Sequence, residues 1–144
     1  MKALITGASS GIGRDMARGL ARRGYDLILV ARRTERLEEL GRTLPVQVQT
    51  ISLDLAQKGN CRALYEQVKD QDLDILINNA GRGLFGPFDE TDLEEELAML
   101  DINTDEFIHA AIADKGHDAS KFLSSPGIYI LLAKCFIISD FDPD

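Results

Sequence analysis

The sequence predicts an α/β protein built on a doubly wound parallel sheet with the strand order 3-2-1-4. Two observations favour this fold. Short apolar runs alternate with amphipathic helical patterns along residues 1–78, as in a parallel sheet whose strands are covered on both faces. A glycine-rich loop also joins the first apolar run to the first helical pattern. Right-handed crossovers would then place the ligand crevice at the carboxyl ends of the strands, where the strand order reverses.

The glycine-rich loop, residues 6–13, follows a strand predicted at residues 2–5. Gly7 allows a tight turn, Gly11 lets the backbone approach a phosphate, and Gly13 lets the helix pack close to the strand. The helix that begins here directs its unpaired N–H groups toward the loop, which favours an anionic ligand. The spacing Gly-x-x-x-Gly-x-Gly differs from the ordinary dinucleotide fingerprint, Gly-x-Gly-x-x-Gly.

The elements up to residue 81 follow from apolar periodicity and from helix signals. Gly24 is the expected stop of the first helix, Thr34 the expected cap of the second, and Pro45 the residue that ends it. The predicted elements are a helix at residues 11–24, a strand at 25–31, a helix from 34 to 44, a strand at 46–51, a helix at 56–69 and a strand at 73–77.

Beyond residue 81 the pattern is weaker. After a Gly/Pro-containing loop, Thr91–Glu94 has the spacing of a capping box, and the helix that it opens reaches Asn103 with Leu93, Leu97 and Leu100 on one face. Signals fade from about residue 110. The apolar run 128–138 reads as a fifth strand or as a helix, and we predict that it pairs beside the fourth strand or packs over its open face, because an unpaired strand edge invites aggregation.

Composition narrows the function classes. The chain has 144 residues, 44% of them apolar and 28% charged, which suits one globular domain. Residues 1–44 hold nine Lys/Arg and five Asp/Glu, a net charge of +4, whereas residues 45–144 hold seven and nineteen, a net charge of −12. The overall charge of −8 argues against nucleic-acid binding, and the basic half is the half with the predicted anion site.

The histidines and cysteines show no pattern of a metal site or a disulfide. His109 and His117 lack partners at metal-ligand spacing, so no metal is expected. Cys61 and Cys135 show no Cys-x-x-Cys pattern and read as reduced thiols. With no apolar run long enough for a membrane helix and no room for a signal peptide before residue 2, we expect a cytoplasmic protein without a membrane partner.

Four motifs resemble those of one family. Thr6–Gly13, Asp54–Leu55, Asn78–Gly81 and Leu100–Thr104, in this order and spacing, resemble a classical short-chain dehydrogenase/reductase over about residues 1–109. The resemblance implies a Rossmann domain at 1–109 that binds NAD or NADP and transfers hydride to or from a carbonyl or alcohol substrate. Residues 110–144 would be a diverged segment that completes or caps the same domain.

The resemblance also assigns roles to individual residues. Asn103 matches the family's helix asparagine, whose backbone carbonyl helps to hold a water in the proton relay, and Asn78 would brace the central strand. The family's dimers and tetramers use helices around Asn103 and the one after it, so a homo-oligomer stays open. The residues implied to bind the cofactor are Gly7, Ser9, Ser10, Gly11, Ile12 and Gly13 at the diphosphate, Asp54 and Leu55 at the adenine, and Asn79, Ala80 and Gly81 at the adenosine ribose.

The end of the second strand predicts the choice of cofactor. NAD-dependent members place an acidic side chain there to bond the ribose 2′-OH. Here Ala31 is followed by Arg32 and Arg33, and a guanidinium can bind a 2′-phosphate through two charge-assisted hydrogen bonds. The sequence therefore predicts NADP(H) in preference to NAD(H).

The catalytic part of the family pattern is missing. Complete members carry a Ser and a Tyr-x-x-x-Lys pair after the helix asparagine, but Tyr129 is followed four residues later by Ala133, with Lys134 one place too far. Tyr65 and Lys69 have the right spacing, but they belong to the third helix. The sequence thus predicts a truncated or diverged oxidoreductase with impaired catalysis. The alternatives are a non-catalytic NADP-binding or interaction module and an incomplete gene product.

Overall fold

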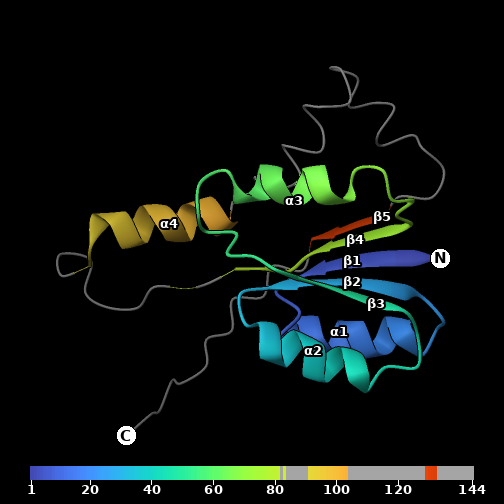
Figure 1. The fold of residues 1–144 in the computed structure, drawn as a ribbon. Coiled ribbons are helices and arrows are strands. Elements are labelled where there is room, and N and C mark those ends of the chain that lie inside the picture. The colour runs from blue at the N-terminus through green and yellow to red at the C-terminus, as the bar shows by residue number, and fades with distance from the viewer. Residues whose placement is uncertain (82, 84–90, 104–128, 133–144) are drawn as a thin grey trace, which may run out of the picture.

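The computed structural model describes residues 1–81, 83, 91–103 and 129–132, which form a parallel sheet with helices on both faces (Figure 1). The sheet order is β3-β2-β1-β4-β5, and each neighbouring pair is parallel. The predicted order 3-2-1-4 is confirmed, and part of the apolar run 128–138 forms the fifth strand beside β4. The elements are β1 (Lys2–Thr6), α1 (Gly11–Ala21), β2 (Asp26–Ala31), α2 (Thr34–Arg42), β3 (Val48–Ser52), α3 (Asn60–Val68), β4 (Ile75–Asn78), α4 (Leu93–Asn103) and β5 (Tyr129–Leu132).

The side chains of β1 alternate between two apolar clusters, one on each face of the sheet. Ala3 and Ile5 pack with residues of α1 and α2, whereas Leu4 packs with residues of α3. Figure 1 shows α1 and α2 together on one face and α3 on the other. Because successive side chains of a strand point to opposite faces, a strand covered on both faces must be apolar at nearly every position. This explains the continuous apolar runs in the sequence.

The strand register brings the carboxyl ends of four strands to one edge. Thr6 pairs with Val30 of β2, Ile5 pairs with Ile77 of β4, and Ala31 pairs with Ser52 of β3. The loops that follow β1, β2, β3 and β4 therefore leave the sheet at the same level. This edge carries the candidate site.

The helix predicted to run from 34 to 44 ends at Arg42, and two other helix boundaries differ more from the prediction. The first helix ends at Ala21, and Gly24 lies beyond it with φ +80° and donates its N–H to the Ala21 carbonyl, so Gly24 is the stop but not part of the helix. The third helix begins at Asn60 instead of residue 56, because the loop after β3 folds on Asp54. The carboxylate of Asp54 accepts the N–H of Ala56 at 3.1 Å, which competes with helix formation there.

Two predicted caps are wrong. Arg33 is the residue that precedes α2, and the Thr34 hydroxyl donates to Ser52 Oγ at 2.8 Å instead of capping the helix. At α4 the cap is Asp92, whose carboxylate accepts the N–H of Glu95 at 3.2 Å. The cap thus lies at Asp92, one residue after the predicted Thr91.

The predicted apolar face of α4 is exposed where the structure describes it. Leu93 is 65% exposed and Leu97 is 44% exposed, and the side chain of Leu100 lies outside the described part. The described helices include none with the length and apolar character needed to cross a membrane. Predictions for most of the loop at 82–88, for His109 and His117, and for residues 133–144 with Cys135 also lie outside the described residues.

Candidate functional site

The loop between β1 and α1 is shaped by two glycines. Gly7 has φ +66°, a left-handed conformation that is strained for residues with a Cβ. A Cβ on Gly13 would lie 2.5 Å from the Gly7 carbonyl oxygen and 2.5 Å from Asn79 Nδ2. The first turn of α1 therefore lies directly against the loop that precedes it, and glycine at position 13 permits this approach.

A buried threonine ties this loop to the end of β4. The Thr6 hydroxyl donates to Asn78 Oδ1 at 3.1 Å and accepts the N–H groups of Asn79 and Ala80 at 3.0 and 2.9 Å. Asn79 Nδ2 in turn donates to the carbonyls of Thr6 and Gly7 at 3.1 and 3.3 Å. Thr6 is completely buried, so its hydroxyl replaces water for three polar groups at once.

The amino terminus of α1 is open to a ligand. Ser10 precedes the helix in an extended conformation, and its side chain makes no cap hydrogen bond to the helix. Both neighbouring hydroxyls serve another purpose, because Arg33 Nη2 donates to Ser9 Oγ at 3.5 Å and to Ser10 Oγ at 3.3 Å. The N–H groups of the first turn are thus left to an external acceptor, and the helix dipole favours an anion.

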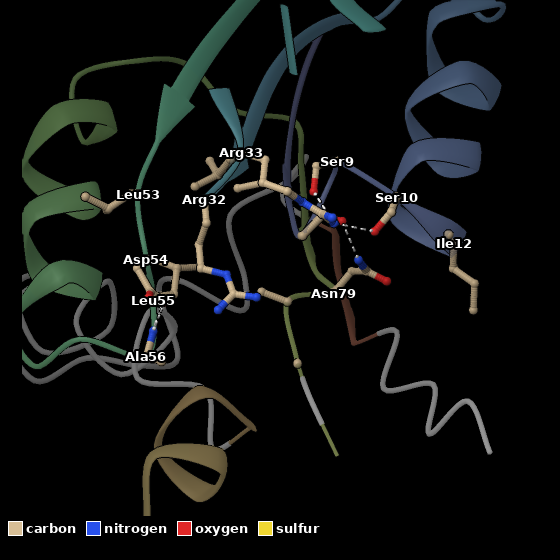
Figure 2. Close-up of a pocket in the computed structure, with 16 residues that line it drawn as sticks. Ser9, Ser10, Ile12, Arg32, Arg33, Leu53, Asp54, Leu55, Ala56 and Asn79 are labelled. Atoms are coloured by element: carbon tan, nitrogen blue, oxygen red, sulfur yellow. Dashed lines mark hydrogen bonds between the residues drawn. The ribbon is translucent and has the colours of Figure 1, made fainter. Parts of the chain in front are cut away.

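Two arginines follow β2 and extend in different directions (Figure 2). Arg33 reaches over the glycine loop to Ser9 and Ser10, whereas Arg32 extends toward the loop that carries Asp54 and Leu55. Both arginines are exposed, and Ala31 before them is buried. The end of β2 thus presents two positive charges and no carboxylate.

The loop after β3 is held by Asp54. Its carboxylate accepts the Ala56 N–H at 3.1 Å, and its carbonyl accepts Asn60 Nδ2 at 2.8 Å. Leu55 is buried and packs with the α3 side of the core. The hydrogen bonds of Asp54 and the burial of Leu55 therefore hold this loop in place.

These loops enclose a pocket of about 220 Å³. The pocket brings together every predicted cofactor-binding residue except Gly13. Gly13 is not a lining residue, but its close approach to Gly7 and Asn79 shapes the glycine loop. Sequence reasoning missed Val30, Leu53 and Ala56 as lining residues and gave Ala31 no contact. Their positions in the sequence could have identified them, because they are neighbours of the end of β2 and of the Asp54–Leu55 pair. The lining residues are Gly7, Ser9, Ser10, Gly11, Ile12, Val30, Ala31, Arg32, Arg33, Leu53, Asp54, Leu55, Ala56, Asn79, Ala80 and Gly81.

The predicted catalytic residue is not brought to this pocket by any described contact. Asn103 is the last residue of α4, and its side chain lies outside the described part of the chain. Lys134 also lies outside the described residues, and Tyr129 is described only as the first residue of β5. The role of Asn103 stays a prediction.

Comparison with known proteins identifies the family. The family model for short chain dehydrogenases matches residues 1–113. The chain belongs to the short-chain dehydrogenase family. This short-chain dehydrogenase chain spans about half the length of the first curated relatives that it matches.

Individual relatives agree with this assignment. An uncharacterized oxidoreductase of Staphylococcus epidermidis is 33% identical over 109 residues, which cover 74% of this chain and 47% of the relative. A short-chain dehydrogenase from Sphingobium yanoikuyae, solved in complex with NADPH, is 37% identical with a TM-score of 0.71, covering 79% and 48% of the two chains. An alcohol dehydrogenase from Thermococcus sibiricus, complexed with 5-hydroxy-NADP, is 36% identical with a TM-score of 0.68, covering 78% and 52%.

Proposed function

We propose that the pocket binds NADP(H) in preference to NAD(H), and that the chain is a short-chain oxidoreductase with impaired catalysis. The observation that carries the proposal is the position of Arg33, whose guanidinium lies on Ser9 and Ser10 of the glycine loop. Arg33 thus puts a positive charge between the glycine loop and the end of β2, where the ribose 2′-group of the cofactor is expected. The short-chain dehydrogenase of Sphingobium yanoikuyae with NADPH and the alcohol dehydrogenase of Thermococcus sibiricus with 5-hydroxy-NADP support the same choice.

The glycine loop fits the cofactor's diphosphate. A Cβ on Gly11 would meet no atom within 4 Å, so the space beside this residue is open. The first-turn N–H groups of α1 have no side-chain cap from Ser10 and can donate to phosphate oxygens. Gly7, Gly11 and Ser10 would hold the diphosphate through the backbone.

The two arginines fit a 2′-phosphate. A guanidinium binds phosphate through parallel charge-assisted hydrogen bonds, whereas a carboxylate at the same place would repel it. Arg33 is already oriented by two serine hydroxyls, so binding would require little further ordering of its side chain. Asp54, the one carboxylate among the described lining residues, is held by the Ala56 N–H in the loop after β3.

Turnover is a separate matter from binding. When bound, NADPH would supply a hydride to a carbonyl, and NADP would accept one from an alcohol. The family's Tyr-x-x-x-Lys pair moves the accompanying proton, and no such pair follows Asn103 in this sequence. The second candidate function is a non-catalytic NADP-binding or interaction module, which needs the pocket of the glycine loop but no proton-transfer pair.

A titration followed by a turnover assay tests the proposal. We expect the intrinsic fluorescence of NADPH to change on addition of the chain, with a lower Kd than for NADH, and carbonyl reduction to be slow or absent. Tighter binding of NADH than of NADPH would contradict the proposal. Binding without turnover supports the module, and binding of neither nucleotide supports an incomplete gene product.

Other expectations stay predictions. They are the boundary at residue 109 between the nucleotide-binding domain and the segment 110–144, a homo-oligomer, a small carbonyl or alcohol substrate, and a cytoplasmic location.

A further inference from the structure

A pair of hydroxyl groups connects the turn that carries both arginines to the end of β3. Thr34 Oγ1 donates to Ser52 Oγ at 2.8 Å, and Ser52 Oγ donates to the carbonyl oxygen of Arg32 at 3.2 Å. Each hydroxyl uses its single proton once, so both hydrogen bonds can exist together. Ser52 therefore bonds to the residues on either side of Arg33.

This connection begins where the regular sheet ends. Ala31 and Ser52 form the last register pair of β2 and β3, and the Leu53 N–H donates to the Ala31 carbonyl at 3.0 Å. Beyond that pair, Arg32 and Arg33 form a two-residue turn before α2. No side-chain cap hydrogen bond fixes the start of α2. Among the described contacts, the bond from Ser52 Oγ to the Arg32 carbonyl is the side-chain hydrogen bond to the backbone of this turn, and the bond from Thr34 Oγ1 joins the Thr34 side chain to the same hydroxyl.

We propose that Ser52 is a positioning residue for cofactor choice: it holds the turn at Arg32–Thr34 so that the Arg33 guanidinium reaches the glycine loop. Ser52 does not line the pocket and acts through the backbone of the turn. The inference rests on the proposed preference for NADP(H). Contacts to the diphosphate and the adenine serve NADPH and NADH alike, so loss of the Ser52 hydroxyl affects only the contacts to the 2′-phosphate.

The test compares three variants of the full chain. Ser52→Ala removes both hydrogen bonds, Ser52→Thr keeps the hydroxyl, and Thr43→Ala removes a matched hydrogen bond, from Thr43 Oγ1 to the Leu40 carbonyl at 2.7 Å, at the opposite end of α2. Dissociation constants for NADPH and NADH are measured by fluorescence titration. We expect Ser52→Ala to weaken NADPH binding about three- to tenfold, the range expected for one or two lost hydrogen bonds, and to change NADH binding less than about twofold. Ser52→Thr restores the wild-type ratio of the two constants, and Thr43→Ala leaves it unchanged.

The outcomes separate this inference from the proposal on which it depends. If the wild-type chain shows no preference for NADPH, the proposed function fails and the inference fails with it. If the wild type prefers NADPH but Ser52→Ala keeps the same ratio, or weakens both nucleotides equally, Ser52 has no positioning role. Failure of Ser52→Thr to restore the ratio also overturns the inference. Because Ser52 and Thr43 are both exposed, we expect all three variants to fold, which thermal unfolding checks.

Discussion

Gly13 occupies the most crowded position of the glycine loop. A methyl group there would meet the Gly7 carbonyl and Asn79 Nδ2, each at 2.5 Å, and the carbonyl belongs to a backbone that Asn79 itself holds. Gly19, in the same helix, is different, since a Cβ there would have Arg23 Nη1 at 3.7 Å as its nearest neighbour. Glycine is therefore required by close contacts at position 13 but not at position 19.

We predict opposite effects of alanine at these two glycines. Gly13→Ala should lower the free energy of unfolding by about 2–3 kcal/mol, the cost of overpacking. It should also weaken NADPH binding at least about tenfold, because the loop must shift. Gly19→Ala should raise the free energy of unfolding by about 0.5–1 kcal/mol, since alanine favours a helix interior. Urea denaturation and NADPH titration measure both effects, and equal stability of the two variants would refute the crowding argument.

Arg33 should determine the discrimination between the two cofactors. We expect Arg33→Ala to weaken NADPH binding about ten- to a hundredfold, the loss expected for hydrogen bonds to a charged group, with little change for NADH. Arg36→Ala is the control. Arg36 lies on α2 and is exposed, as Arg33 is, but it does not line the pocket. A similar loss with both variants would indicate a general effect of charge instead of a specific contact.

For single residues, the sequence predicts which positions belong to the site better than it predicts which residues they form hydrogen bonds with. The glycine spacing and the two arginines are visible as a local pattern. The hydrogen-bond partner of Thr34 is not visible in a local pattern. Ser52 lies 18 residues away in the sequence, and the pairing of β2 with β3 brings it close to Thr34. A rule based on local spacing assigned the Thr34 hydroxyl to a helix cap, and a long-range contact took it instead.

The helices differ in how much apolar surface they bury. Leu64 of α3 is completely buried in the core, whereas Leu93 and Leu97 of α4 are exposed. The helical spacing of apolar residues predicts an apolar face in both helices, but a spacing pattern does not identify the surface that covers the face. The periodicity of α4 therefore predicts a helix but does not predict what covers its apolar face.

Matched substitutions of leucine should reveal this difference. We expect Leu64→Ala to lower the free energy of unfolding by about 2–5 kcal/mol, through lost burial and the cavity that remains. Leu93→Ala should change it by less than about 0.5 kcal/mol, as for an ordinary surface position. Urea denaturation of both variants gives the comparison. A loss of similar size for Leu93→Ala would mean that α4 packs against a further surface.

Over the whole molecule, the order of elements along the chain determines most of the sheet. Alternating strands and helices joined by right-handed crossovers lead to the order 3-2-1-4, and the structure has this order. The position of β5 could not be derived from its own residues, because the run 128–138 suits a strand and a helix equally. Its assignment depends on the open edge of β4, a property of the assembled sheet. The candidate pocket follows from the same topology, whereas the directions of Arg32 and Arg33 depend on side-chain contacts that no pattern encodes.

The pairing of β5 with β4 should contribute to stability. Truncation after Gly127 removes β5 and its register pairs with Ile75–Asn78. We expect it to lower the free energy of unfolding by about 1 kcal/mol for each backbone hydrogen bond lost, and to promote self-association through the exposed edge of β4. Truncation after Leu132 keeps β5 and serves as the control. Denaturation and sedimentation measurements compare the two, and unchanged behaviour after removal of β5 would contradict the predicted role of the strand.

The hydrogen bonds of Asn79 to Thr6 and Gly7 span 73 and 72 positions of the chain. The amino-terminal loop therefore cannot take its final shape while only the first strands have been synthesised. On the ribosome, the nascent chain should acquire affinity for a nucleotide only after residues 75–80 have emerged and β4 has joined β1. Capture of a dinucleotide would then mark the moment at which the central strands of the growing polypeptide have come together.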